Sequence, residues 1–320
     1  MYKRVQLILT VLIFFAVGCQ KSDIENQLSP QALDSSNDSY VRLKGATISK
    51  LSPEGLERIN KILASDGFNY RVAMAEMITT ADDVENMGHL VIAKDVGSKK
   101  LNIDFVPGDP RRKWSGESAT KITYAIDQTE DAKPAVGALT AEEATEAIDN
   151  AFKTWNNVKR TKLGLTKIDA GDMNLGVVSG VQIPNDVLAD IQMAGWEDVN
   201  FKTGVLGVTY TFLFVDNEGN PTDINNDKKY DAAFREIYFN PAYSWSNDGV
   251  SDYDVETIAL HEIGHGLSQG HFGTVFIDKN DELKVLPRAV MNAYYLGTLR
   301  ELQKNDIGGH SSIWASWPNK

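Results

Sequence analysis

The chain has 320 residues and carries 44 acidic against 32 basic side chains, which gives a formal charge of −12 at pH 7 and a pI near 4.9. Such an acidic chain offers no basic stripe that could neutralise phosphates, so we exclude nucleic acid and anionic lipid as partners. Once the first 40 residues are set aside for the reasons below, about 280 residues remain, consistent with two domains of ordinary size.

The N-terminus has the pattern of an export signal. Lys3 and Arg4 precede an apolar run at residues 7–17, which is too short to span a bilayer. The run ends in Ala16-Val17-Gly18-Cys19, which resembles the lipobox of bacterial lipoproteins. Cys19 is the only cysteine, so it cannot form an internal disulfide. We expect residues 1–19 to be a lipoprotein signal peptide with Cys19 as the lipidation site.

Residues 20–40 are rich in serine, asparagine and aspartate, which predicts a flexible tether. The protein is then expected to be exported and lipid-anchored to the bacterial outer membrane, with the lipid as its only membrane contact. Asp23 and Glu25 resemble the surface-export signals of some Gram-negative lipoproteins and favour a surface location.

Residues 41–112 form the next unit, an N-terminal accessory domain or a removed pro-domain. A helix is predicted after Ser52-Pro53, because apolar residues there recur at helical spacing. Strands are predicted at 70–78, 89–95 and 101–106. The unit ends in a turn-rich, dibasic stretch at Arg111-Arg112, which we expect to be exposed.

The remaining unit, residues 113–320, opens with a strand at 121–127 that alternates in polarity. Thr140 and Glu143 then form a capping box at the start of a helix. Apolar residues follow at intervals of three and four as far as Val158, which predicts one buried stripe along that helix.

A loop further on places oxygen-bearing side chains at alternate positions: Asp223, Asn225, Asp227 and Asp231. Two interpretations stay open for it. One is a structural calcium site, although the glycine and the bidentate glutamate of an EF-hand are absent. The other is a solvated hairpin loop.

The chemistry concentrates at His261-Glu262-Ile263-Gly264-His265, followed by His271. Three of the five histidines fall within these eleven residues. On a helix His261 and His265 share one face and can bind one Zn²⁺, and Glu262 can take a proton from a zinc-bound water. His271 can return as a third ligand after Gly266, which leaves the fourth position open, as in catalytic sites.

These residues resemble the motif of the metzincin metalloproteases, HExxHxxGxxH followed by a methionine turn. Ser268 stands where the family has glycine, so we expect a differently built turn, because serine adopts positive φ less readily. A downstream glutamate, Glu282 or Glu301, is the alternative third ligand.

Other segments are similar to the matrixin branch of that family. The resemblance implies that Met291, in Ala289-Val290-Met291-Asn292, lies beneath the zinc site. It also implies that an edge strand and one pocket wall bind the substrate peptide through these residues: Gly204, Val205, Leu206, Gly207, Ala293, Tyr294 and Tyr295. Two short strands, 275–277 and 283–286, are expected to form an extra hairpin beside the cleft.

A latency device is a further hypothesis. Astacin-like relatives place an aspartate of a Phe-x-Gly-Asp motif on the zinc, and Phe105-Val106-Pro107-Gly108-Asp109 resembles this motif with one extra residue. Asp109 is therefore a candidate latency switch. The alternative is that the segment simply ends in an exposed turn.

The resemblance implies an α+β, metzincin-like zincin fold, with a twisted mixed β-sheet over the zinc helix and a smaller helical C-terminal subdomain. The expected function is that of a monomeric zinc endopeptidase acting on a protein or peptide substrate, with Glu262 as the base. The competing hypothesis is a catalytically silent, surface-anchored module that binds peptides. A third is a self-processing or immunity-type protein with one dedicated target.

Overall fold

The computed structural model describes the following residues: 42–43, 46–47, 53–81, 101–114, 120–129, 134, 139–159, 161–179, 187–199, 201–280 and 282–319. The predicted signal peptide with Cys19, the tether and the predicted strand at 89–95 lie outside these ranges. Within them, none of the helices has the length and hydropathy that a bilayer crossing requires.

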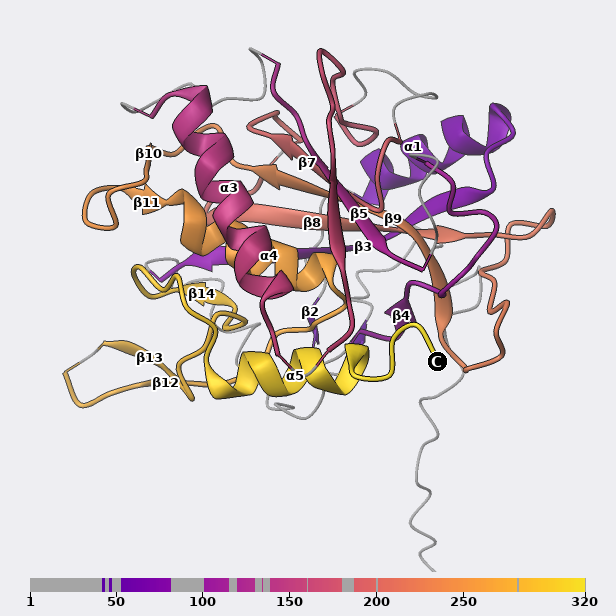
Figure 1. Cartoon of the computed structure of the whole chain (residues 1–320). Helices are drawn as coiled ribbons and strands as arrows, with labels where there is room; N and C mark the ends of the chain where they lie inside the picture. Colours follow the sequence, from indigo (N-terminus) through magenta and orange to yellow (C-terminus); the bar gives the residue numbers. More distant parts are fainter. Residues whose placement is uncertain are drawn as a thin grey trace, which may run out of the picture.

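The centre of the molecule is one eight-stranded mixed sheet (Figure 1). Its strand order is β14-β3-β8-β9-β7-β5-β6, and β4 also pairs with β9. Strands β5, β6, β7 and β9 are parallel, whereas β8 is antiparallel to both β9 and β3. The bounds are β3 Tyr70–Thr80, β4 Ile103–Asp104, β5 Ile122–Ile126, β6 Leu165–Ile168, β7 Ile191–Gly195, β8 Val205–Phe214, β9 Tyr230–Phe239 and β14 Tyr294–Tyr295.

The described residues also form three small two-stranded sheets. The predicted extra hairpin is present as β12 and β13, which pair antiparallel. Their bounds, and those of the other two pairs, are β1 Arg42–Leu43, β2 Ala46–Thr47, β10 Trp245–Ser246, β11 Tyr253–Asp254, β12 Thr274–Ile277 and β13 Leu283–Leu286.

Helices cover both faces of the sheet. Helix α1 (Pro53–Ser65) packs on one face through Leu63, where Val208 and Phe212 of β8 belong to the same apolar cluster. On the other face of β8, the hydroxyl of Thr209 reaches helix α4 (Val255–Gly266). Because successive strand residues point to opposite faces, β8 is buried on both, and all ten of its residues are buried.

Helix α3 (Ala141–Asn156) confirms its predicted signals. Thr140 and Glu143 form the capping box, and the apolar stripe is buried against α4. The Trp155 indole N–H donates to the Leu260 carbonyl at 2.8 Å, which ties α3 to α4. In Figure 1, α3 and α4 lie side by side in front of the sheet, and helix α5 (Lys304–Trp314) lies below them.

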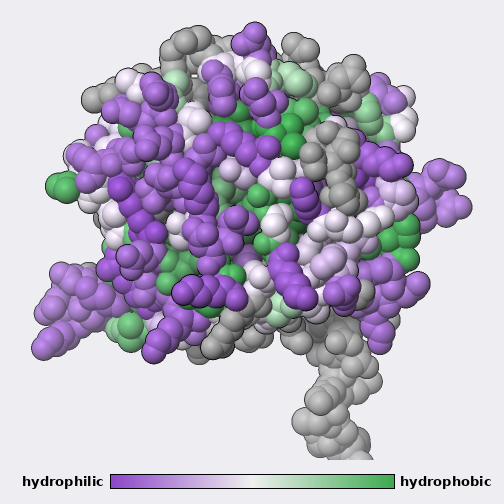
Figure 2. Space-filling view, viewed as in Figure 1, coloured by the Kyte–Doolittle hydropathy of each residue, from purple (hydrophilic) through white to green (hydrophobic). Residues whose placement is uncertain are grey.

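The sheet and helices together confirm the expected α+β fold, with a mixed sheet over the histidine-bearing helix. The face drawn in Figure 2 is mostly hydrophilic, and its hydrophobic residues gather mainly toward the centre of the view. Large exposed hydrophobic side chains include Val250 and Leu286.

Two features of the N-terminal unit differ from expectation. The predicted strand at 101–106 is shorter in the structure and corresponds to β4, which pairs with β9. Just before β4, the Leu101 N–H donates to the Ser268 carbonyl instead. Strand β3 is longer than predicted and pairs with β8 inside the main sheet. The sheet therefore contains strands from both sides of the expected boundary at residue 112.

Candidate active site

The histidines converge from one helix and the turn that follows it. Helix α4 is capped by Asp254, whose carboxylate accepts the Thr257 N–H at 2.9 Å. His261 and His265 project from the same face, as their spacing of four predicts. His271 joins them from beyond the helix, and the three Nε2 atoms lie 3.0 Å from one another.

The turn before His271 keeps the left-handed conformation without the family's glycine. Ser268 has φ +64°, a conformation that costs an L-residue about 1 kcal/mol. The backbone N–H of Ser268 donates to the His265 carbonyl and that of Gln269 to the Gly264 carbonyl. These helix-end hydrogen bonds hold Ser268 at a positive φ, the conformation that we expected serine to adopt less readily.

Hydrogen bonds on the far side of two rings fix the histidine tautomers. His261 Nδ1 lies 2.7 Å from the Val290 carbonyl and His265 Nδ1 lies 2.8 Å from the Gln269 carbonyl. Because a carbonyl only accepts, each Nδ1 carries the proton and each Nε2 lone pair faces the other histidines.

Burial keeps the imidazoles neutral. It lowers the pKa of His261 to about 4, and together with repulsion from the neighbouring histidines it lowers the pKa of His265 and His271 well below the usual value. Neutral nitrogens are the form that binds a metal ion. Tetrahedral zinc places nitrogen ligands about 3.3 Å apart, so a triangle with 3.0 Å sides fits zinc.

Glu262 follows the first histidine and is fully buried. Its Oε2 accepts the Thr209 hydroxyl at 2.6 Å, and its Oε1 accepts the Ile78 backbone N–H at 3.2 Å. A Cβ on Gly207 would lie 2.9 Å from that Oε1, so glycine makes room for the carboxylate. Burial raises the pKa of Glu262 to about 8, and a cation nearby would favour its charged form.

Met291 packs under the helix, on Gly264. A Cβ on Gly264 would lie 2.2 Å from the Met291 sulfur, so only glycine allows this approach. The carboxylate of Asp306 on α5 accepts the backbone N–H groups of Val290 and Met291 at 3.0 and 3.1 Å. These bonds hold the methionine turn, whose Val290 carbonyl orients His261.

Both expected peptide-binding segments are paired with β3. In β8, Gly207 pairs with Ile78, so β8 has neighbours on both sides and is not the expected edge strand. In β14, Tyr294 and Tyr295 pair with Thr79 and Thr80. The sequence predicted a strand at 70–78, and the structure has one at 70–80. The amino-acid composition of this strand carries no signal for the strands with which it pairs.

The structure does not bring Asp109 to the histidines. Its carboxylate is buried and accepts three hydrogen bonds from the Arg111 guanidinium at 2.7–3.2 Å. The dibasic stretch is not the exposed turn we predicted. Arg112 is buried and its guanidinium donates to Asp190 at 2.9 Å, while Arg111 also donates to Asp231 at 2.6 Å.

The residues suggested for calcium are occupied by the protein itself. Asp231 is buried, where it accepts hydrogen bonds from Arg111 and Thr222. Asp223 and Asp227 accept backbone N–H groups of their own loop. In the part of the chain that the structure describes, the three histidines are the one group of ligand atoms close enough for a metal ion, and neither Glu282 nor Glu301 belongs to it.

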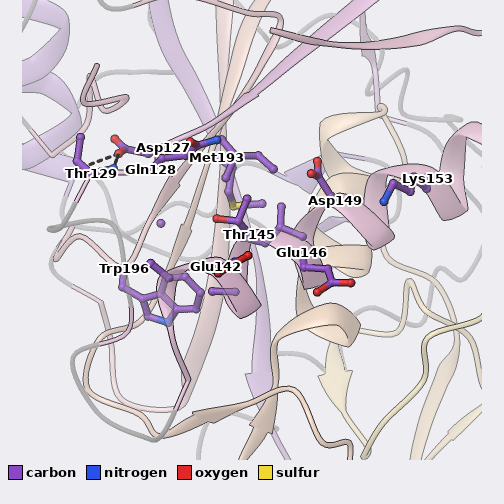
Figure 3. Close-up of a pocket in the computed structure, with 15 residues that line it drawn as sticks. Asp127, Gln128, Thr129, Glu142, Thr145, Glu146, Asp149, Lys153, Met193 and Trp196 are labelled. Carbon is purple, nitrogen blue, oxygen red and sulfur yellow. Dashed lines mark hydrogen bonds between the residues drawn. The ribbon is translucent and has the colours of Figure 1, made fainter. Parts of the chain in front are cut away.

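A pocket of about 500 Å³ lies elsewhere, between the first turns of α3 and the ends of β5 and β7 (Figure 3). Glu142, Glu146 and Asp149 of α3 line it together with Trp196. None of the predicted site residues lines it. The carboxylates that line this pocket are not next to the three histidines, so we assign it no catalytic role.

Comparison with known proteins agrees with the geometry. No curated protein matches the chain. The matrixin family model matches residues 113–315, which is more than half of the chain and includes every described strand from β5 to β14 and the whole of α5. This span contains the three converging histidines, Glu262 and the turn at Met291. The chain is therefore a member of the matrixin family.

Proposed function

We propose that the protein is a zinc-dependent endopeptidase. The observation that carries this proposal is the triangle of three neutral imidazole nitrogens with Glu262 beside it on the same helix. Three protein ligands leave a coordination position open, which is typical of catalytic zinc. A purely structural site would not need a carboxylate there.

The chain's own residues supply the proton transfers. Zinc held by His261, His265 and His271 would acidify water and polarise the substrate carbonyl. Glu262 takes the proton from water as its oxygen adds to the carbonyl carbon, and then gives that proton to the departing amine. The hydroxyl of Thr209, 2.6 Å from Glu262 Oε2, holds the carboxylate in place for both transfers.

The substrate in this proposal is an extended peptide. It would lie along β8 at Gly204–Gly207 and beside Ala293–Tyr295, where main-chain hydrogen bonds hold a peptide whatever its side chains. The pairing that these segments make with β3 supports this, because it demonstrates that both can bond an extended strand at once.

The test needs the whole chain. A form beginning at Lys113 would lack Arg111 and Arg112 and leave Asp190 and Asp231 buried without these partners, a change that typically costs several kcal/mol. We would incubate the zinc-loaded chain with a mixed peptide library and identify the products by mass spectrometry. Glu262→Gln, which keeps the shape of the side chain and removes the base, is the matched control.

Cleavage by the parent and at least a 100-fold slower reaction of Glu262→Gln are expected. A folded parent that binds one zinc ion and cuts nothing would refute the endopeptidase proposal. The filled groove beside β8 favours a second candidate in that case, namely a silent or single-target protein of the same fold.

We also propose that the protein is exported and lipid-anchored at Cys19. The signal-like residues 1–19 and the single cysteine support this. Labelling of cells with an alkyne fatty acid should mark the parent and not Cys19→Ser. Equal labelling of both proteins would rule out Cys19 as the anchor.

A further inference from the structure

Strand β3 occupies the place that the proposed function gives to a substrate peptide. It is antiparallel to β8 and parallel to β14, so it lies between the two segments expected to bind peptide. The Thr79 N–H donates to the Ala293 carbonyl at 3.1 Å and the Thr80 N–H to the Gly204 carbonyl at 2.8 Å. In Figure 1, the purple arrow of β3 runs beside β8 and ends near β14.

This strand closes the site. His261, Glu262 and His265 are fully buried, and Glu76 and Ile78 of β3 are buried with them. The Glu76 carboxylate lies 3.6 Å from His265 Nδ1, and neither of its oxygens has a hydrogen-bond partner among the described residues. An outside peptide could not take the place between β8 and β14, next to His261, Glu262 and His265, while β3 stays in this position, although His271 is only partly buried.

One peptide bond of β3 is presented to the base. The Ile78 backbone nitrogen, which is the amide nitrogen of the Met77–Ile78 bond, donates to Glu262 Oε1 at 3.2 Å. In peptide hydrolysis the scissile amide nitrogen is the atom that finally receives the proton from the general acid. Glu262 therefore contacts the nitrogen that would leave if this bond were cut.

We infer that β3 is the protein's own first substrate, cut at Met77–Ile78, and that this cut opens the groove to other peptides. The inference rests on the proposed endopeptidase function. The oxygen of water bonds to the Met77 carbonyl carbon, the bond to the Ile78 nitrogen breaks, and Glu262 carries the proton across. The products are a Met77 carboxylate and a new N-terminus at Ile78.

The chain is held in place on both sides of the Met77–Ile78 bond. Residues 70–77 are fixed by the ladder with β8 and by α1, where Asn60 bonds the backbone of Val72 at both its N–H and its carbonyl. Residues 78–80 are fixed between β8 and β14. A bond that is held on both sides, with its nitrogen bonded to the base, has lost most of its freedom to move, and such positioning favours an intramolecular reaction.

The experiment follows the fate of the full chain itself. The zinc-loaded parent and Glu262→Gln would be incubated and analysed by intact-mass spectrometry and labelling of new N-termini, with the peptide library present in parallel. We expect a fragment beginning at Ile78 in the parent, its loss in Glu262→Gln, and peptide cleavage that rises as the fragment accumulates. The half-time should not change when the protein is diluted 10-fold, because the strand lies in its own groove.

Each other outcome is decisive. Peptide cleavage by a parent that stays intact at Met77–Ile78 would overturn the inference and leave the proposed function standing. An intact chain that also spares every peptide would overturn both. Cutting at Met77–Ile78 without peptide cleavage would support self-cleavage, would overturn the claim that the cut opens the groove to other peptides, and would restrict the function to this one target. A cleavage rate that rises in proportion to protein concentration would overturn cleavage within one chain.

A second measurement does not depend on catalysis. In the metal-free chain, the backbone amides of residues 70–80 should be protected from hydrogen exchange as strongly as those of β9. Exchange at the rate of an unstructured peptide would show that the groove is empty and would overturn the inference. Ile78→Pro removes the N–H that bonds Glu262 and should abolish the fragment that begins at Ile78. If this variant misfolds, the hydrogen-exchange measurement on the unaltered chain still tests the inference.

Discussion

Gly264 gives a direct test of how the methionine turn supports the zinc helix. An alanine Cβ at this position would lie 2.2 Å from the sulfur of Met291 and 3.1 Å from a ring carbon of Trp155. Non-bonded atoms normally stay roughly 3.5–4.0 Å apart, so the sulfur or the helix would have to move by about 1.5 Å.

Two opposing effects set the size of the change in Gly264→Ala. Overpacking of a buried site typically costs about 1–3 kcal/mol, whereas replacing glycine by alanine inside a helix gains roughly 0.5–1 kcal/mol. We expect a net loss of about 1–2 kcal/mol in the free energy of unfolding. Gly308→Ala in α5 is the matched control, since no atom lies within 4 Å of its added Cβ and only the helix gain applies.

Urea denaturation of the metal-free proteins would measure both variants. A Gly264→Ala protein as stable as Gly308→Ala would refute the argument that Met291 packs on this glycine. The clash also predicts coupling, so that adding Met291→Ala to Gly264→Ala should cost less than Met291→Ala costs in the parent. Strict additivity of the two changes would contradict the contact.

Further predictions concern pH, the zinc ligands and the buried arginine. Burial lowers the pKa of His310 to about 4, so the stability it contributes is complete above the unfolded pKa of about 6.5 and is lost as pH falls toward 4. Between pH 7 and 4.5 this amounts to about 2–3 kcal/mol, and urea denaturation of His310→Phe should show a smaller loss of stability over that range. An unchanged pH profile in this variant would mean that His310 is not buried in its neutral form. His271→Ala should weaken zinc binding at least about 100-fold, whereas Glu282→Ala and Glu301→Ala should keep one zinc per chain by metal analysis. Loss of zinc in either glutamate variant would reinstate the glutamate as a ligand. Arg112→Met leaves the Asp190 carboxylate buried without its arginine and should lower the free energy of unfolding by about 3–5 kcal/mol. Lys284→Met, which breaks an exposed ion pair, should leave stability unchanged, and equal effects of the two changes would refute the burial argument.

Local patterns carried the predictions that succeeded. The spacing of four between His261 and His265 defines one helix face, and the Thr140–Glu143 capping box defines a helix start, because both depend on residues close in sequence. The turn at Ser268 was predicted less well, since serine there takes its conformation from hydrogen bonds to the end of α4.

The features that the sequence did not predict depend on pairing between segments that are distant in the chain. Strand β3 was predicted as a strand, but its position between β8 and β14 joins residues more than 120 positions apart, and such pairing leaves no periodic signal. The role suggested for Asp109 came from a short motif, and the role suggested for Asp231 came from the spacing of neighbouring residues. Both carboxylates are instead partners of Arg111. Asp109 lies only two residues from it, whereas the contact with Asp231 depends on how distant segments fold together.

The ion pairs of Arg111 and Arg112 set which piece of the chain would leave after the proposed cut. They hold residues 101–114 to Asp190 and Asp231, downstream of Met77–Ile78, so the part with the histidines keeps this segment. The N-terminal piece would carry residues 1–77, including the proposed lipid site at Cys19, and it would stay on β8 until the ladder of residues 70–77 opens. In this scheme the cut removes the covalent link between the protease and its proposed anchor, so that opening of the groove and release from the membrane would both follow from one event, the departure of residues 70–77 from β8.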